Sequence, residues 1–353
     1  MPFDSEQTSQ QLRAVYVDMG TTNTRAWFMA GSRVIAKAAS PVGVRDSARE
    51  KSSETIRNGL REVISRVRAE ALPSSTAYIA DYIAAAGMIG SPLGLVEVPH
   101  VAAPAGLEEL SAGARWHQFH DVADLPFLLT PGVRCGPELV TVSSINQADV
   151  MRGEETLCAG LVSLGLVQRP GIVLNLGSHC KVVQLDGGGR IQSSVTSLSG
   201  ELIHVTQQNT ILSSSVAQER PQQFSKKWIE AGMAEQRRSG LGRALFCTRL
   251  LDVAKQATAE DRLAFVVGAF IASDLDALMA GGVLNRNINV AIVGASGIAH
   301  AWHAALQHAQ ISATIISGTE AENAFLTALR LILSRHLETK QLLMKNVRRT
   351  FSS

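Results

Sequence analysis

The sequence contains an internal repeat whose two copies begin about half a chain apart. Without any gap, residues 15–21 (VYVDMGT) align with residues 172–178 (IVLNLGS), and the same register places Gly31 on Gly188. Each copy has an apolar run, a glycine with hydroxyl neighbours, a second apolar run, a polar turn and a third apolar run. Apolar runs separated by such turns are typical of antiparallel strands. The repeat therefore predicts a three-strand meander at the start of each half.

The segments after each meander show helix-like and strand-like patterns. Apolar residues recur at helical spacing from Ile56 to Val67, with Ser52 and Ser53 before them as N-cap candidates. Residues 78–86 are typical of a buried strand, and the glycine- and proline-rich stretch 87–105 predicts a functional loop. In the second half we expect a buried helix over 263–278, a strand over 288–293, a turn over 294–297, a helix over 298–307 and a basic helical end beyond Arg330.

The length of 353 residues suggests two domains, because domains average roughly 150 residues. Prolines and glycines cluster between residues 130 and 146, where we place the linker. We therefore expect an N-terminal lobe over 12–145, a C-terminal lobe over 146–335 and a central cleft between them. The fold class is α/β, with the meander duplicated and helices added to each copy.

Charge and composition exclude several classes of protein. The chain has 33 Lys and Arg against 31 Asp and Glu, so its net charge of +2 gives no electrostatic basis for binding nucleic acid or a membrane. The most apolar stretch, 263–272, is shorter than the ~18 residues of a membrane span, and the polar N-terminus lacks a secretion signal's apolar core. The four cysteines show no CxxC spacing. We expect a soluble cytoplasmic protein and leave its oligomeric state open, with a homodimer as one option.

Both turns between the first two apolar runs have the composition of a phosphate-binding hairpin. Backbone N–H groups and hydroxyls in such a turn can face a polyphosphate, and glycine allows close approach. Asp18 would lie beside the phosphates and hold a hydrated Mg²⁺, an ion that takes few protein ligands. One such hairpin alone would be ordinary turn chemistry, but two matching copies favour a nucleotide gripped from both sides. The hairpin residues are Gly20, Thr21, Thr22 and Asn23, and then Gly177, Ser178 and His179.

A third small-residue turn follows the apolar run 290–293. It opens a helix, and backbone at such a point can approach a nucleotide closely, although tight packing alone would also explain it. Its residues are Gly294, Ala295, Ser296 and Gly297.

The order of these three turns resembles the actin-like ATPase and sugar kinase superfamily, whose fold is ribonuclease H-like. A narrower resemblance rests on five strings: DMGTTNTRAW (18–27), GMIGS (87–91), DVMRGEET (149–156), GSHCKVV (177–183) and SGEL (199–202). Together they are similar to the 2-dehydro-3-deoxygalactonokinase family, over most of the chain. The resemblance implies a kinase that uses ATP and Mg²⁺ to phosphorylate the terminal hydroxyl of a 2-keto-3-deoxy sugar acid, first of all 2-dehydro-3-deoxy-D-galactonate.

Three carboxylates precede the second hairpin, at Asp149, Glu154 and Glu155. In related sugar kinases an acid that opens the corresponding helix accepts the alcohol proton. The resemblance therefore implies Glu154 as the base, with Glu155 and Asp149 as alternatives. These acids would equally favour the positive N-terminal end of a helix without any catalytic role.

Several polar residues are candidates for substrate contacts. Arg152 would bind the substrate carboxylate through two parallel hydrogen bonds, or would instead pair with Glu154 or Glu155. Arg25 would face either the phosphates or a neighbouring acid. The other candidates, each with a purely structural alternative, are Gly87, Met88, Ile89, Gly90, Ser91 and Glu97 on the long loop, and Lys181 beside His179 in the second hairpin.

The sequence departs from the family pattern at two aromatic positions, where it has Met19 and Val182. These changes put the identity of the sugar acid in question more than the reaction type. Two other classes of function stay in view: a non-catalytic sugar-acid sensor on the same fold, and a Rossmann oxidoreductase. The sensor would need an output module, which is not evident. The oxidoreductase would need GxGxxG after the first strand, where the chain has Gly20–Asn23.

Overall fold

The computed structural model describes residues 12–71 and 79–350, with side chains described up to residue 339. The chain forms two compact units. The first comprises the chain up to Leu164 together with the segment from Glu322, and the second runs from Gly165 to Ala321.

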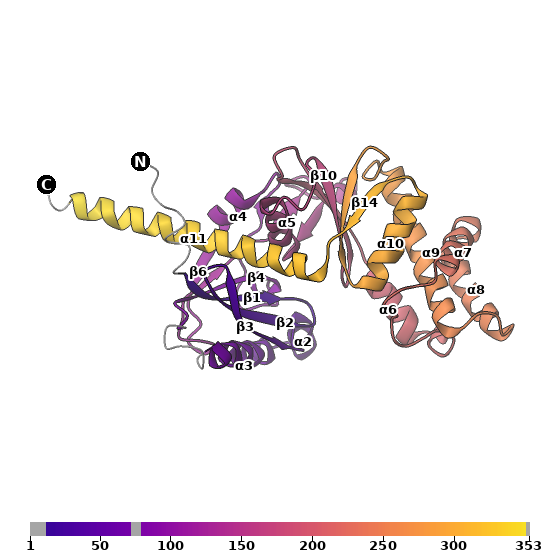
Figure 1. Ribbon diagram of the computed structural model, residues 1–353, viewed down its shortest axis with the longest axis horizontal. Helices are drawn as coiled ribbons and strands as arrows, with labels where there is room; N and C mark the ends of the chain where they lie inside the picture. The colour runs from indigo at the N-terminus through magenta and orange to yellow at the C-terminus, as the bar shows by residue number, and fades with distance from the viewer. Residues whose placement is uncertain (1–11, 72–78, 351–353) are drawn as a thin grey trace. The chain divides into compact units, whose positions relative to one another are not determined.

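The first unit is built on a six-stranded sheet with the order β3-β2-β1-β4-β7-β6. Helix α3 packs on β1–β3 and buries its apolar face, including Ile56, Leu60 and Val63, in the core of this unit (Figure 1). The strands are β1 (Arg13–Met19), β2 (Thr24–Ala30), β3 (Arg33–Ser40), β4 (Tyr82–Gly87), β6 (Arg115–His117) and β7 (Phe127–Leu129). The helices are α2 (Val44–Glu50), α3 (Glu54–Ala71), η2 (Met88–Gly90), α4 (Leu107–Gly113), η3 (Ile145–Gln147), α5 (Glu154–Ser163) and the long α11 (Gly318–Thr350).

The second unit repeats this plan with a five-stranded sheet, β12-β11-β10-β13-β14. Its strands are β10 (Gly171–Leu176), β11 (Cys180–Leu185), β12 (Ile191–Ser197), β13 (Asn289–Gly294) and β14 (Ser312–Ile315). Its helices are α6 (Ser199–Asn209), η4 (Ile211–Ser214), α7 (Lys226–Ser239), α8 (Leu241–Val253), α9 (Ala259–Ala280) and α10 (Ser296–His308).

The two sheets confirm the predicted duplication strand by strand. In each copy the first strand is antiparallel to the second and parallel to a later strand, β4 or β13. Asp18 lies opposite Arg25 on β2, and the corresponding Asn175 lies opposite Lys181 on β11. The second hairpin is one residue shorter than the first, because β11 begins at Cys180 directly after His179.

The boundary between the units differs from the predicted one. The segment 130–146 is not a linker, because β8 (Val133–Cys135) pairs with β5 (Val101–Ala102) and β9 (Asp149–Met151) in a three-stranded sheet of the first unit. Helix α5 also belongs to this unit. A Cβ atom at Gly160 would lie 1.8 Å from the carbonyl oxygen of Ala324, so α5 and α11 touch backbone to backbone. The first unit therefore extends to Leu164 and also includes the C-terminal segment from Glu322.

Most of the expected elements form as predicted. The helix over 263–278 is the central part of α9, and the stretch beyond Arg330 continues α11. Helix α10 begins at Ser296 rather than 298, since the turn ends at its N-cap Ala295. The strand predicted over 78–86 begins at Tyr82 and ends at Gly87, and residue 78 lies outside the described residues.

Helix α9 is long and apolar enough to cross a membrane by length and composition, but 67% of that stretch is buried inside the protein. It crosses α7 closely, since a Cβ atom at Gly268 would lie 2.1 Å from the carbonyl oxygen of Ile229. Such burial is typical of the core helix of a soluble protein.

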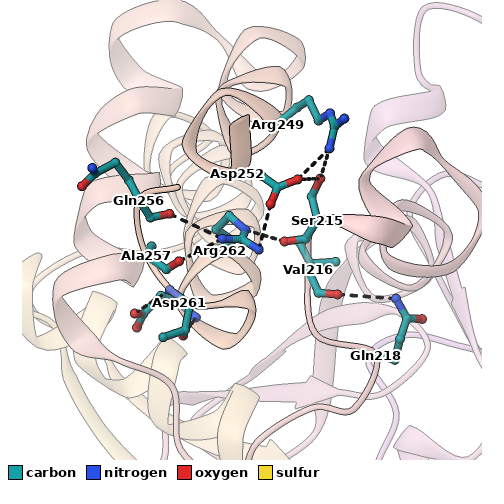
Figure 2. A network of polar contacts seen from close by, with 10 residues as sticks. Ser215, Val216, Gln218, Arg249, Asp252, Gln256, Ala257, Asp261 and Arg262 are labelled. Carbon is teal, nitrogen blue, oxygen red and sulfur yellow. Dashed lines mark hydrogen bonds and ion pairs between the residues drawn. The ribbon is translucent and has the colours of Figure 1, made fainter. Parts of the chain in front are cut away.

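A polar network ties the end of α8 to the start of α9. Asp252 accepts hydrogen bonds from Arg249 (2.6 Å) and Ser215 (2.8 Å) and pairs with Arg262 at 3.2 Å. Figure 2 shows these side chains converging between the helices. The Ser215 hydroxyl and the two arginines hold the pKa of Asp252 below its usual range. The network fixes the helical part of the second unit to the chain that follows η4.

Candidate functional site

Each of the two predicted phosphate hairpins is closed by a backbone hydrogen bond that its glycine donates across the turn. The Gly20 N–H donates to the Asn23 carbonyl at 2.8 Å, and the Gly177 N–H donates to the His179 carbonyl at 3.0 Å. Gly177 is exposed, and a Cβ atom there would meet nothing within 4 Å. Open space at this glycine leaves room for a ligand against the backbone.

Each hairpin is also contacted by the N-terminus of the helix that follows its meander. A Cβ atom at Gly43, the N-cap of α2, would lie 2.5 Å from the carbonyl oxygen of Thr21. A Cβ atom at Gly200, in the first turn of α6, would lie 2.5 Å from the carbonyl oxygens of Gly177 and Ser178. The ungapped register that aligns Gly20 with Gly177 also aligns Gly43 with Gly200. Extending the alignment of the two copies would therefore have identified Gly43 and Gly200 as a pair from the sequence.

A second glycine pair occupies the ends of β4 and β13. A Cβ atom at Gly87 would lie 2.5 Å from the carbonyl oxygen of Met19, and one at Gly294 would lie 2.7 Å from that of Leu176. The predicted loop glycine and the predicted nucleotide-turn glycine are therefore equivalent positions in the two copies. Each lets the end of a parallel strand approach the base of a hairpin.

Asp18 lies at the end of β1, partly exposed, beside residues from two other segments. A Cβ atom at Gly87 would lie 3.4 Å from its Oδ1. Burial raises the pKa of Asp18 to about 6, the Arg25 guanidinium opposes that rise, and the negative charge of Glu154 adds to it. The carboxylates of Asp18 and Glu154 therefore lie near enough to repel each other, an arrangement that a bound cation would relieve.

The two glutamates that open α5 differ in environment. Glu155 is 1% exposed, and its carboxylate accepts the Gly153 N–H at 2.9 and 2.8 Å and the Thr156 hydroxyl at 3.1 Å. Burial, with the charge of Glu154, raises the pKa of Glu155 to about 7. Glu154 is partly exposed and has no hydrogen bond or ion pair within the described part of the chain. Glu155 therefore stabilises the helix start, and Glu154 has the carboxylate open to a ligand.

The third acid, Asp149, lies on β9 and faces Cys135 in the strand register. It belongs to the small sheet rather than to the helix start.

Arg152 is held by the long loop. Its Nη2 donates to the Val98 carbonyl at 2.6 Å and lies 3.3 Å from Nδ1 of His100. Burial lowers the pKa of Arg152, against the charges of Glu155 and Glu97. Within the described residues, Nη1 is buried without a hydrogen-bond partner, and no ion pair joins Arg152 to Glu154 or Glu155. The alternative of a structural bridge to those acids therefore does not hold.

The other loop candidates divide by burial. Ile89 is fully buried in the core of the first unit, and the Ser91 hydroxyl donates to the Met88 carbonyl at 2.7 Å. Any contact of Ile89 or Ser91 with a substrate would therefore use the backbone. Glu97 is exposed, and Gly90 packs against Arg152, with a built Cβ 3.3 Å from Nη1.

In the second unit, His179 and Lys181 have different surroundings. Nε2 of His179 lies 3.8 Å from the carboxylate of Glu201 in the first turn of α6. Lys181 is buried on β11. The departures from the family pattern, Met19 and Val182, are buried in the cores of their respective units.

Helix α9 supports the second hairpin from behind. The Ser197 hydroxyl donates to Oδ1 of Asp274 at 2.8 Å and lies 2.7 Å from that of Ser199, just before Gly200. Burial raises the pKa of Asp274 and, with the charge of Asp274, raises the pKa of the Cys180 thiol. No sequence pattern indicated this long-range support, because Asp274 is far from α6 in the sequence.

The turn after β13 is shaped by close packing as well as by exposure. Ala295 and Ser296 are exposed, whereas Gly297 is buried and a Cβ there would lie 2.3 Å from the Pro221 carbonyl oxygen. Gly297 therefore serves packing, and the exposed pair before it is open to a ligand.

No cluster of three metal-ligating side chains occurs within residues 12–71 and 79–339.

Comparisons with known proteins agree with this construction. A 28% identical stretch of 221 residues matches the 2-dehydro-3-deoxygalactonokinase of Escherichia coli (strain K12), covering 63% of this chain and 64% of that relative, under two thirds of its length. A Rhizobium meliloti (strain 1021) protein named as a probable 2-dehydro-3-deoxygalactonokinase is 27% identical over 88% of this chain and 94% of its own. The crystal structure of a candidate 2-dehydro-3-deoxygalactonokinase from Sinorhizobium meliloti superposes with a TM-score of 0.69 at 25% identity, covering 90% of this chain and 99% of that one.

The duplicated sheets, each with a glycine hairpin at the end of its first strand, define a protein of the actin-like ATPase and sugar kinase fold, as the sequence predicted. A profile of the family described as 2-keto-3-deoxy-galactonokinase matches residues 18–331. The chain belongs to this family.

Proposed function

We propose that the protein transfers the terminal phosphate of ATP to the terminal hydroxyl of a 2-keto-3-deoxy sugar acid, first of all 2-dehydro-3-deoxy-D-galactonate. Family membership supports the reaction, and the observation that carries the proposal is the matched construction of the two hairpins, each closed by a hydrogen bond from its glycine and contacted by a helix N-terminus. Each hairpin would supply backbone donors to the phosphates of the nucleotide.

Glu154 is the base of the proposed reaction. Its carboxylate has no partner in the described structure, opens α5, and acts electrostatically on Asp18 at the end of β1. Phosphoryl transfer requires little covalent work from the protein, so a carboxylate placed to accept the alcohol proton is sufficient. Glu155 is bound to the Gly153 N–H and buried, which removes it from this role.

Asp18 would hold Mg²⁺, because the neighbouring negative charges of Asp18 and Glu154 favour a divalent cation. The ion, when bound, neutralises the charge that develops on the transferring phosphate. Asp18 would hold the ion through its water shell, and Arg25, which lies opposite Asp18 in the strand register, would contact the phosphates.

The acid end of the substrate would bind at Arg152. A buried guanidinium nitrogen without a partner is costly, and a carboxylate oxygen satisfies it with a charge-assisted hydrogen bond. The substrate would also contact the long loop, at Gly87, Met88, Gly90 and Glu97. The adenosine would lie at the exposed residues Ala295 and Ser296.

The test is a coupled assay of ADP release across a panel of sugar acids. We expect release that depends on a 2-keto-3-deoxy acid and on Mg²⁺. The variant Glu154→Gln should lose at least 10²-fold in kcat while it binds ATP as the wild type does, since general bases contribute ~10²–10⁴-fold. The exposed Glu138→Gln is the matched control. Sugar-acid binding without ADP release would instead identify a sensor.

We also propose a cytoplasmic location. The four cysteines are widely separated in the sequence and show no CxxC spacing, as in proteins kept reduced.

A further inference from the structure

Asp274 connects α9 to the junction between the second hairpin and α6. The Ser197 hydroxyl donates to Oδ1 of Asp274 at 2.8 Å, and the same hydroxyl oxygen accepts the Ser199 N–H at 3.2 Å. Ser197 is paired in the strand register with Cys180, the residue directly after the hairpin. Burial raises the pKa of Asp274, and the two serine hydroxyls and the Cys180 thiol oppose that rise. One carboxyl group therefore interacts with both sides of the junction.

This junction determines where the hairpin backbone can lie. Gly200 follows Ser199 directly, and a Cβ atom at Gly200 would lie 2.5 Å from the carbonyl oxygens of Gly177 and Ser178. Because the start of α6 and the hairpin are packed this closely, a shift of the helix start would displace the hairpin. The series of contacts that begins at Asp274 therefore ends at the hairpin proposed to bind phosphate.

The first half of the protein secures the equivalent junction with a local hydrogen bond. Thr24 begins β2 as Cys180 begins β11, and its buried hydroxyl donates to the Val42 carbonyl at 2.7 Å, directly before Gly43. The second half has a thiol at this position, and a thiol is a much weaker donor than a hydroxyl. The two halves therefore hold the same junction by different means, and in the second half the acceptor is Asp274 on a distant helix.

We propose that Asp274 is a positioning residue for the nucleotide. It holds the start of α6 through Ser197 and so keeps the second hairpin in the conformation that binds the phosphates of ATP. A site that has its bound conformation before the ligand arrives has a lower entropic cost of binding. This inference rests on the proposed binding of ATP at the second hairpin, and it gives Asp274 no contact with ATP or the sugar acid.

Calorimetric titration with ATP and Mg²⁺ tests the proposal without depending on catalysis. Asp274→Ala removes the acceptor, and we expect Kd for ATP to rise about 5- to 10-fold, the effect of one lost hydrogen bond, while Kd for the sugar acid changes less than twofold. Asp274→Asn keeps an oxygen that accepts from Ser197 and should recover at least half of that loss. Asp276→Ala is the matched control, because Asp276 lies on the same helix but pairs with Arg237 of α7.

Ser197→Ala tests the same connection from the other side, and it carries the test if Asp274→Ala fails to fold. It should raise Kd for ATP at least as much as Asp274→Ala, and the double variant should bind ATP no worse than Ser197→Ala alone, because one hydrogen bond is lost in each case. A normal Kd for ATP in Ser197→Ala, an equal rise in Asp276→Ala, no recovery in Asp274→Asn, or additive effects in the double variant would each overturn the proposal. A wild type that binds no ATP would instead refute the proposed function itself.

Discussion

Gly43 and Gly200 occupy the same position in the two halves of the protein, each touching the backbone of the hairpin at the end of the first strand. Built Cβ atoms at these residues would come within 2.5 Å of hairpin carbonyl oxygens. The helix start and the hairpin are therefore packed backbone to backbone in each half, and the space between them admits no methyl group.

Gly200→Ala tests this contact. The added methyl would push α6 away from the second hairpin, with an overpacking cost of about 1–3 kcal/mol. We expect KM for ATP to rise at least fivefold while KM for the sugar acid changes less than twofold. Gly187→Ala is the control, because a Cβ there meets nothing within 4 Å. Equal kinetics for the two variants would show that the contact does not position the hairpin.

The pH dependence of nucleotide binding tests Asp18. With a pKa of about 6, its carboxylate is protonated below that pH and releases a cation, so Mg²⁺-dependent ATP affinity should fall as pH drops through 6. Glu154→Gln removes a charge that raises this pKa, so the acid limb of the curve of ATP affinity against pH should move to lower pH. Calorimetric titrations from pH 5 to 8 would measure the pH at which ATP affinity falls in the wild type and in Glu154→Gln. An unmoved limb in Glu154→Gln would contradict the coupling.

Glu155 should make the folded state less stable as pH rises. Its pKa is about 7 in the folded protein against an ordinary 4.5, so the folded state retains a proton that the unfolded chain releases. This contribution is fully present below pH 4.5 and is lost as pH rises through 7, with a slope of up to ~1.4 kcal/mol per pH unit. Glu155→Gln still accepts the Gly153 N–H but does not titrate. Urea unfolding of the variant should therefore depend less on pH between 4.5 and 7, and an identical dependence would refute this role.

Gly160→Ala tests the contact between α5 and α11. The added methyl carbon would lie 1.8 Å from the carbonyl oxygen of Ala324, so it would overlap a backbone atom rather than a side chain that can turn away. We expect a loss of about 3 kcal/mol or more in the free energy of unfolding, at the upper end of overpacking effects. Gly318→Ala, where a Cβ meets nothing within 4 Å, should be neutral. Matching denaturation midpoints for the two variants would contradict the close contact.

The sequence predicted the duplicated meanders because strand alternation and turn glycines are local signals. It misplaced the boundary between the units because prolines and glycines at 131–137 also fit a paired hairpin, and pairing of β8 with β9 leaves no local mark. The sequence pattern did not predict contacts between distant segments, such as the contact between α5 and α11.

For the candidate site, the sequence located the hairpins and the acids but could not rank the acids. Glu154 and Glu155 are neighbours of one type, and only burial separates them. His100 gave no signal, since its contact with Arg152 joins two segments that are far apart in the sequence. The Gly43 and Gly200 pair was visible in the repeat, but its purpose depends on a steric contact that no pattern contains.

The shared architecture of the two halves does not extend to their charge. At the end of the first strand one half has a carboxylate, Asp18, while the other has the uncharged amide of Asn175 at the equivalent point. A cation would therefore find a carboxylate at the first hairpin and only a neutral amide at the second. Nearly symmetric backbones with unequal polarity thus give each hairpin its own preference for the group that it binds.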